Sequence, residues 1–369
     1  MFRRKRSHRV FILSFLLTSI LLLYSSPQRS RAQEQQPPTQ PPLKRMRRTK
    51  GQQPKTPPPT PSTQTQPSSA DDVVRVDTDL ANILLTAIDK DKRFITTLRK
   101  EDVRVTEDNM PQKISIFERE TDLPLTLAIL IDTSRSEERP LPDEKIAAHT
   151  FVDSVLRPER DKAAIISFTG EAVLQESLTN DFGKLRAAIE RVIVELPGND
   201  PRCDENVTVE REPRCWTGIW DAVWVTVNEV LSQTPETARR AIILLTDGDD
   251  TSSITKRQEA IDFAVKNNVV IYSIGIGDPE EFKIDSKALR NVSEKTGGRV
   301  FFPENKAELD AAFAEIQQEL RSQYLIAYTP SNRKRDGSFR QVKVEIINPD
   351  LRKQKLRLLY RQGYYAKKG

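Results

Sequence analysis

Apolar runs and amphipathic stretches alternate along the chain from residue 125 onward. Four runs are mainly apolar and are typical of buried strands: 125–131, 163–168, 241–246 and 269–274. Six other stretches carry apolar residues at helical spacing: 143–156, 181–195, 217–231, 255–267, 285–296 and 306–320. Strands that alternate with helices predict an α/β fold with a doubly wound, mostly parallel sheet, covered by helices on both faces.

Shorter β-like runs lie on both sides of this region. Those before it cover 73–76, 82–88, 103–105 and 113–117, and those after it cover 324–328, 341–347 and 355–360. Each set alone is too small to enclose a stable core. We therefore expect the runs of 71–122 and 322–369 to pair as a small β-sandwich, into which an α/β domain of residues 123–321 is inserted.

The N-terminus has the pattern of a secretory signal. A basic head precedes an apolar stretch over residues 10–24, and Ser30-Arg31-Ala32 offers a small-residue cleavage site. The stretch is short for a membrane span. We expect residues 1–32 to be a cleaved signal peptide, which predicts a periplasmic or secreted protein. An uncleaved N-terminal membrane anchor is the alternative.

Residues 33–70 are rich in Pro, Gln and Thr and contain almost no large apolar side chains. Such a segment buries too little surface to offset its ordering entropy, so we expect a disordered basic linker. Its basic residues 44–48 could touch an anionic surface, such as a membrane, although solvation is the simpler expectation.

The net charge of +5 comes from the N-terminal region. Residues 1–70 hold 13 of the 58 Lys and Arg residues and one of the 53 acids, so the remainder has 45 basic and 52 acidic residues and a net charge of −7. This balance gives no support for a nucleic-acid partner.

The chain has two cysteines, Cys203 and Cys215. In an exported protein, an isolated pair that closes a short loop predicts a disulfide. In the chain-entropy model, a loop of this size gains roughly 3 kcal/mol from the bridge.

The main candidate for chemistry follows the strand of 125–131. Asp132, Ser134 and Ser136 place a carboxylate and two hydroxyls at alternate positions. Thr217 precedes a helix, and Asp247 follows another strand. In an open α/β sheet, ligands collect outside the carboxyl ends of the strands. Hard oxygen donors suit Mg²⁺, or the related Mn²⁺ and Ca²⁺. The alternative is a turn in which these side chains only cap backbone groups.

Asp-x-Ser-x-Ser, a distant Thr and a strand-ending Asp-Gly together resemble the metal-ion-dependent adhesion site of the von Willebrand factor type A domain. The segments 270–277 and 296–302 match too, and the resemblance covers about residues 123–321. With its β flanks, the chain resembles exported bacterial members often labelled acidobacterial-type. The resemblance implies direct ligation by Ser134 and Ser136, direct or water-mediated ligation by Thr217, and mainly water-mediated roles for Asp132 and Asp247.

The same resemblance implies a non-enzymatic adhesion module of the cell envelope, in which an Asp or Glu of a protein or peptide partner completes the metal site. One departure is that Glu137-Glu138 follows the second serine, where the family often has a small or apolar residue and Gly. These carboxylates could raise metal affinity or repel an acidic partner, but we expect both to face solvent.

Two other functions stay open. One is a structural or assembly role in the envelope, with the site vestigial or used within the chain. The other, less favoured, is a metal-dependent hydrolase. The single histidine after the signal, His149, falls in a predicted helix with no nucleophile elbow nearby. No Gly-rich turn follows the first strand, which argues against dinucleotide binding.

Overall fold

The computed structural model describes residues 43–55, 80–119, 123–195, 216–235, 238–277 and 283–368. The expected signal peptide, the strand predicted over 73–76 and both Cys203 and Cys215 lie outside the described residues. Within these ranges, no helix is both long enough and apolar enough to cross a membrane.

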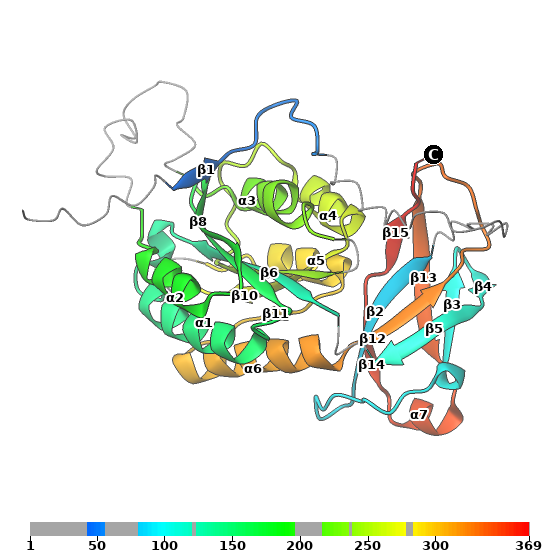
Figure 1. The fold of residues 1–369 in the computed structure, drawn as a ribbon. Helices are drawn as coiled ribbons and strands as arrows, with labels where there is room; N and C mark the ends of the chain where they lie inside the picture. The colour runs from blue at the N-terminus through cyan, green and yellow to red at the C-terminus, as the bar shows by residue number, and fades with distance from the viewer. Residues whose placement is uncertain are drawn as a thin grey trace, which may run out of the picture. The chain divides into compact units, whose positions relative to one another are not determined.

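A seven-stranded sheet with the order β1-β8-β7-β6-β9-β10-β11 organises the α/β part of the chain (Figure 1). Five of its strands run parallel: β6 (Leu125–Asp132), β7 (Lys162–Phe168), β9 (Arg239–Thr246), β10 (Val269–Gly275) and β11 (Val300–Phe301). At one edge, β8 (Ala172–Thr179) pairs antiparallel with β7, and β1 (Lys44–Met46) pairs antiparallel with β8. Strands β6 and β9 are buried along their whole length, which accounts for their unbroken apolar runs.

Helices cover both faces of this sheet (Figure 1). One layer shares a core with Leu127, Ile129 and Ile131 of β6 and contains α1 (Leu141–Val155), α2 (Phe182–Arg191) and α6 (Lys306–Ser322). The other layer shares a core with Ala128 and Leu130 and contains α3 (Ile219–Thr226), α4 (Arg257–Lys266) and α5 (Ser286–Thr296). Because successive side chains of a strand point to opposite faces, β6 contributes alternately to both cores. The predicted doubly wound fold is confirmed.

The helix ends carry recognisable capping groups. The side chains of Asp181, Asp285 and Asn305 accept backbone N–H groups at the starts of α2, α5 and α6. Helix α5 ends at Gly297, whose φ of 92° lies in the left-handed region that glycine tolerates. The helix expected over 217–231 begins two residues later, at Ile219, and changes after Thr226 to a π-helical turn over Val227–Leu231.

The flanking segments form two four-stranded antiparallel sheets. The first has the order β14-β2-β12-β5 and contains β14 (Arg357–Leu359), β2 (Ala81–Ile88), β12 (Tyr324–Tyr328) and β5 (Ile114–Arg119). The second has the order β15-β13-β3-β4 and contains β15 (Gly363–Tyr365), β13 (Phe339–Ile346), β3 (Val103–Glu107) and β4 (Met110–Gln112). A short helix, α7 (Pro349–Lys353), joins β13 to β14.

Strands from before and after the α/β region pair in both sheets. β2 pairs with β12, and β3 pairs with β13. The two sheets share one core, in which Leu85 and Ile326 of the first sheet pack with Val105 and Val344 of the second. The expected β-sandwich of N-terminal and C-terminal strands is therefore confirmed.

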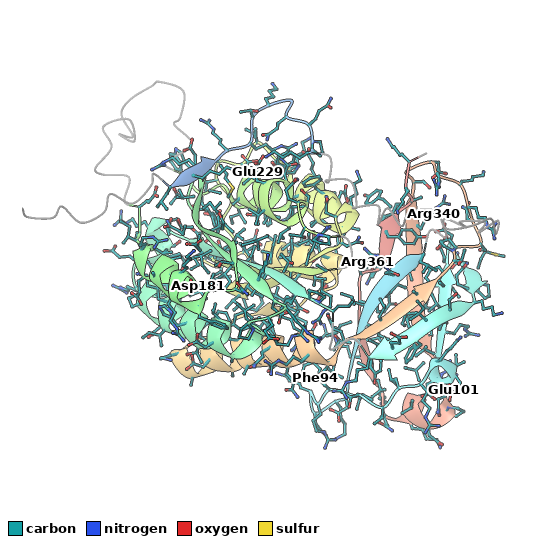
Figure 2. All side chains as sticks on the ribbon, in the orientation of Figure 1. Phe94, Glu101, Asp181, Glu229, Arg340 and Arg361 are labelled. Carbon is teal, nitrogen blue, oxygen red and sulfur yellow. The ribbon has the colours of Figure 1, made fainter. Side chains whose placement is uncertain are left out.

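The prediction of a disordered linker over 33–70 is wrong at residues 43–55. Lys44–Met46 forms β1 on the open edge of β8, and Met46 is only 3% exposed in the core shared with α3. Lys44 lies 3.3 Å from the carboxylate of Glu229, which Figure 2 labels. The exposed edge of β8 supplies the hydrogen-bonding partners that this segment lacks on its own.

Arg48 extends this packing beyond β1. Its guanidinium lies 4.3 Å from the centre of the Trp224 ring and 2.5 Å from the carboxylate of Glu259. Arg45 and Arg47 both pair with Glu171. Much of the basic cluster expected to be solvated is thus engaged by acidic and aromatic groups of the chain itself.

Candidate metal centre

The candidate centre begins at the carboxyl end of β6. Asp132 is the last residue of this strand and is fully buried. Its Oδ1 accepts a hydrogen bond of 2.9 Å from the backbone N–H of Ser134, and its Oδ2 accepts one of 2.6 Å from the hydroxyl of Thr246. Burial raises the pKa of Asp132 to about 7, against the effect of these two donors. An ionised carboxylate held here gains from a nearby cation.

Two serine hydroxyls lie beside Asp132. Ser134 Oγ and Ser136 Oγ are 3.0 Å apart. Two neighbouring ligands of an octahedral Mg²⁺, each about 2.1 Å from the ion, would be about 3 Å apart. The spacing of the hydroxyls therefore fits adjacent positions around one cation.

Asp247 approaches from the neighbouring strand. It follows β9 directly, and β9 pairs in parallel with β6. Its Oδ1 accepts the N–H of Asp249 at 2.9 Å. Burial raises the pKa of Asp247, and hydrogen bonds from the backbone of Asp249 and the side chain of Ser136 oppose that rise. Gly248, with a φ of 87°, makes the turn after it.

Thr217 lies in a loop that packs on the segment after Asp247. Its carbonyl accepts the backbone N–H groups of Thr251 and Ser252, and its own N–H donates to the Thr251 hydroxyl at 2.8 Å. Asp250 accepts the N–H of Ile219 at 2.8 Å at the start of α3. Within the described chain, the Thr217 hydroxyl makes no hydrogen bond to the other four predicted site residues, and the contacts above anchor its backbone to the segment 251–252.

The expectation that Glu137 faces solvent is wrong. Its side chain is 0% exposed, while that of Glu138 is exposed. A 3-10 turn over Arg135–Glu137 directs it inward. One oxygen each of Asp132, Glu137 and Asp247 lie within 4.8 Å of one another. The structure thus adds a third carboxylate to the two predicted from the sequence.

Glu144, in the first turn of α1, is a second acidic residue that sequence reasoning missed. It is also 0% exposed. Burial raises its pKa to about 8, and burial together with the charge of Glu144 raises the pKa of Glu137 well above its ordinary value. A usable signal exists: Glu144 precedes the buried Ala147, Ala148 and Phe151 by three, four and seven positions. Helical spacing alone places it on the inward face.

These residues fit a hard divalent cation. All the candidate ligand atoms are oxygens, two hydroxyls have the separation of adjacent ligands, and the carboxylates of Asp132, Glu137 and Asp247 converge. Among the described residues, no N–H or hydroxyl group donates to the buried side chains of Glu137 and Glu144, which hydrogen-bond to each other. A cation would supply the missing positive partner.

The family model described as "von Willebrand factor type A domain" matches residues 126–317, just over half of the chain. An uncharacterized protein of Borreliella burgdorferi is 30% identical over 131 residues. That match covers 34% of this chain and 37% of the relative, so the chain spans little more than a third of the length of the curated relative.

Two solved structures are similar at lower identity. The conserved hypothetical protein BatB from Bacteroides thetaiotaomicron is 21% identical, with a TM-score of 0.42, and the match covers 54% of this chain and all of BatB. Proximal thread matrix protein 1 from the mussel byssus, with a zinc-occupied MIDAS motif, is 17% identical, with a TM-score of 0.43. That match covers 58% of this chain and 49% of the mussel protein.

Proposed function

Because the chain belongs to the von Willebrand factor type A domain family, we propose that it is a protein-binding module of the cell envelope that acts through a bound divalent cation. The cation is Mg²⁺, Mn²⁺ or Ca²⁺. An Asp or Glu side chain of a protein or peptide partner completes its coordination. The module performs no catalysis.

The observation that carries this proposal is the 3.0 Å separation of the Ser134 and Ser136 hydroxyls beside the buried Asp132. Neutral hydroxyl ligands leave most of the positive charge of a cation uncompensated, so an incoming carboxylate is attracted. Asp132 and Asp247 hold this constellation through hydrogen bonds and through water, and Thr217 ligates directly or through water according to the conformation of its loop.

A binding role also agrees with the surroundings of His149. This residue lies in α1, and its Nε2 is 2.7 Å from a carboxylate oxygen of Glu190 in α2. The imidazole of the one histidine that follows the expected signal peptide is therefore engaged by a carboxylate between two helices. The expected signal peptide supports an exported location for the module.

A second candidate function is favoured by Glu137. A resident carboxylate that converges on Asp132 and Asp247 could satisfy the cation without a partner. The protein would then be a structural or assembly component of the envelope whose site is used within the chain.

The proposal is tested by capture from an envelope extract in Mg²⁺ and in excess chelator. Wild-type protein should retain a partner only in Mg²⁺, and free glutamate in excess should release it. Asp132→Ala should abolish this capture while the far-UV circular dichroism stays unchanged. The control is Asp153→Ala, which removes a carboxylate of α1 that pairs with Arg186 on the surface. Equal capture by wild type and Asp132→Ala, or capture that survives the chelator, contradicts the proposal.

A further inference from the structure

We propose that Glu137 is a resident carboxylate of the cation site, which raises the affinity of this chain for a divalent cation before any partner binds. This inference deepens the proposed function and rests on its cation. It assigns a role to a residue outside the five predicted from the sequence.

Position is the first support. Glu137 directly follows the hydroxyl donor Ser136, and a 3-10 turn directs it away from solvent. One of its oxygens lies within 4.8 Å of oxygens of both Asp132 and Asp247. Two carboxylate oxygens bound to one hard cation at about 2.1–2.6 Å are separated by no more than about 5 Å. The three groups therefore lie close enough together to act on one ion.

The lack of donors is the second, independent support. Asp132 receives two hydrogen bonds, and Asp247 receives one from the backbone of Asp249. In contrast, both oxygens of Glu137 are buried, and no N–H or hydroxyl group in the described part of the chain donates to them; the side chain that Glu137 meets is the carboxyl group of Glu144, a second acid. A buried carboxyl group without such donors either keeps its proton or takes a cation as its partner, and a cation bound by the neighbouring hydroxyls and aspartates favours the second state.

Glu144 strengthens the attraction for a cation. It is also completely buried, and its carboxyl group hydrogen-bonds to that of Glu137. We assign Glu144 no direct contact with the ion. A bound cation favours the ionised form of Glu144, and the charge of that form then adds to the potential at the site, where low polarity reduces screening.

The residues of the site therefore have different roles. The hydroxyls and aspartates define where the ion sits, and Glu137 adds one anionic ligand, which raises affinity. The same charge weakens the attraction of the bound ion for a partner's carboxylate. The chain should therefore hold its cation tightly without a partner and bind an acidic partner moderately.

The test is calorimetric titration of the full chain with Mn²⁺ alone. Glu137→Gln should weaken Mn²⁺ binding at least about tenfold, the size of effect expected when a group that supports a metal site is lost. Glu138→Gln is the matched control, because it makes the same chemical change on the exposed neighbour, and it should stay within about twofold of wild type. An equal affinity of Glu137→Gln and wild type overturns the inference.

A second variant covers the case in which Glu137→Gln does not fold. Glu137→Asp keeps the charge and withdraws it by one methylene, so it should bind Mn²⁺ more weakly than wild type and more tightly than Glu137→Gln. A luminescence count of waters on Tb³⁺ should rise by about one in Glu137→Asp if the ligand is lost. An unchanged count together with unchanged Mn²⁺ affinity overturns the inference.

The Mn²⁺ titration and the capture experiment test the inference and the proposed function separately. If Mn²⁺ binding depends on Glu137 but capture from extract does not depend on the metal, the inference stands and the adhesion role fails. If capture depends on the metal but Mn²⁺ affinity is the same with and without the Glu137 carboxylate, the adhesion role stands and the inference fails.

Discussion

The hydroxyl of Thr246 donates a hydrogen bond of 2.6 Å to Asp132 Oδ2, across 114 positions of sequence. The two residues end the neighbouring parallel strands β9 and β6. Thr246 fixes one oxygen of the carboxylate, and the backbone of Ser134 fixes the other. The orientation of Asp132 is therefore set by the neighbouring strand and by the turn that follows β6.

Removal of this donor should loosen the site. Thr246→Val keeps the side-chain volume but leaves a buried acceptor unpaired, so the unfolding free energy should fall by about 1–3 kcal/mol. Mn²⁺ affinity should fall several-fold because Asp132 is less well oriented. Thr226→Val in α3 is the control: its buried hydroxyl has no hydrogen-bond partner among the described residues, so this change should be neutral or stabilising. Urea denaturation and calorimetry check both variants. Equal losses of stability and Mn²⁺ affinity in the two variants would contradict the role of Thr246 in orienting Asp132.

The stability of the protein should depend on the protonation of Glu319, which lies outside the candidate metal centre. Burial raises the pKa of Glu319 to about 7, and the charge of Arg299 and a hydrogen bond from Tyr272 oppose the rise. The unfolded chain loses this proton near the ordinary value of 4.5. Between these pH values the folded state holds the proton more tightly, so the unfolding free energy falls as pH rises, by up to about 3 kcal/mol.

Glu319→Gln should lack the part of the pH dependence of the unfolding free energy that comes from Glu319. Urea denaturation at about pH 4.5 and pH 8 should give a smaller loss of stability for the variant than for wild type, because the amide does not titrate. The hydroxyl of Tyr272 can still donate to the Gln oxygen. Identical pH dependence in the two proteins would show that Glu319 does not hold a proton in the folded state.

Strand β1 should contribute to stability through one side chain. Met46 is 3% exposed and packs in the core shared with α3, so Met46→Ala should cost about 2–5 kcal/mol. Arg45 points to the opposite face of the strand and pairs at 3.6 Å with Glu171. Its side chain is half exposed, so Arg45→Ala should cost less than about 1 kcal/mol. Denaturation midpoints of the two variants give the comparison; no loss in Met46→Ala would mean that β1 does not stay docked in solution.

The disulfide between Cys203 and Cys215 stays a prediction. Mass spectrometry of the non-reduced protein should find a mass two hydrogens below that of the dithiol, and two free thiols would refute the bridge. Cys215 precedes Thr217 by two positions, so the bridge should restrict the loop that delivers Thr217. Reduction should then weaken metal-dependent capture more than it lowers stability. If reduction lowers capture and stability to the same extent, the bridge stabilises the protein but has no particular link to the site.

The sequence by itself determined that a central sheet is covered by helices, and it determined where the central strands end. A strand buried on both faces must be mainly apolar, and a helix on a sheet must repeat its apolar residues at helical spacing. These local requirements appear directly in β6, β9 and α6. They also place Asp132 and Asp247 at the carboxyl ends of two strands, because polar residues that follow a buried strand mark its carboxyl end.

Only the tertiary structure decided the environment of Glu137, the position of β1 and the docking of Thr217. Glu137 and Glu138 are chemically identical, and the 3-10 turn buries one and exposes the other. β1 has three residues and little apolar content, so its order depends on the free edge of β8, which lies more than a hundred positions away. Local pattern cannot reveal such features, because their free energy comes from partners that only the folded chain brings together.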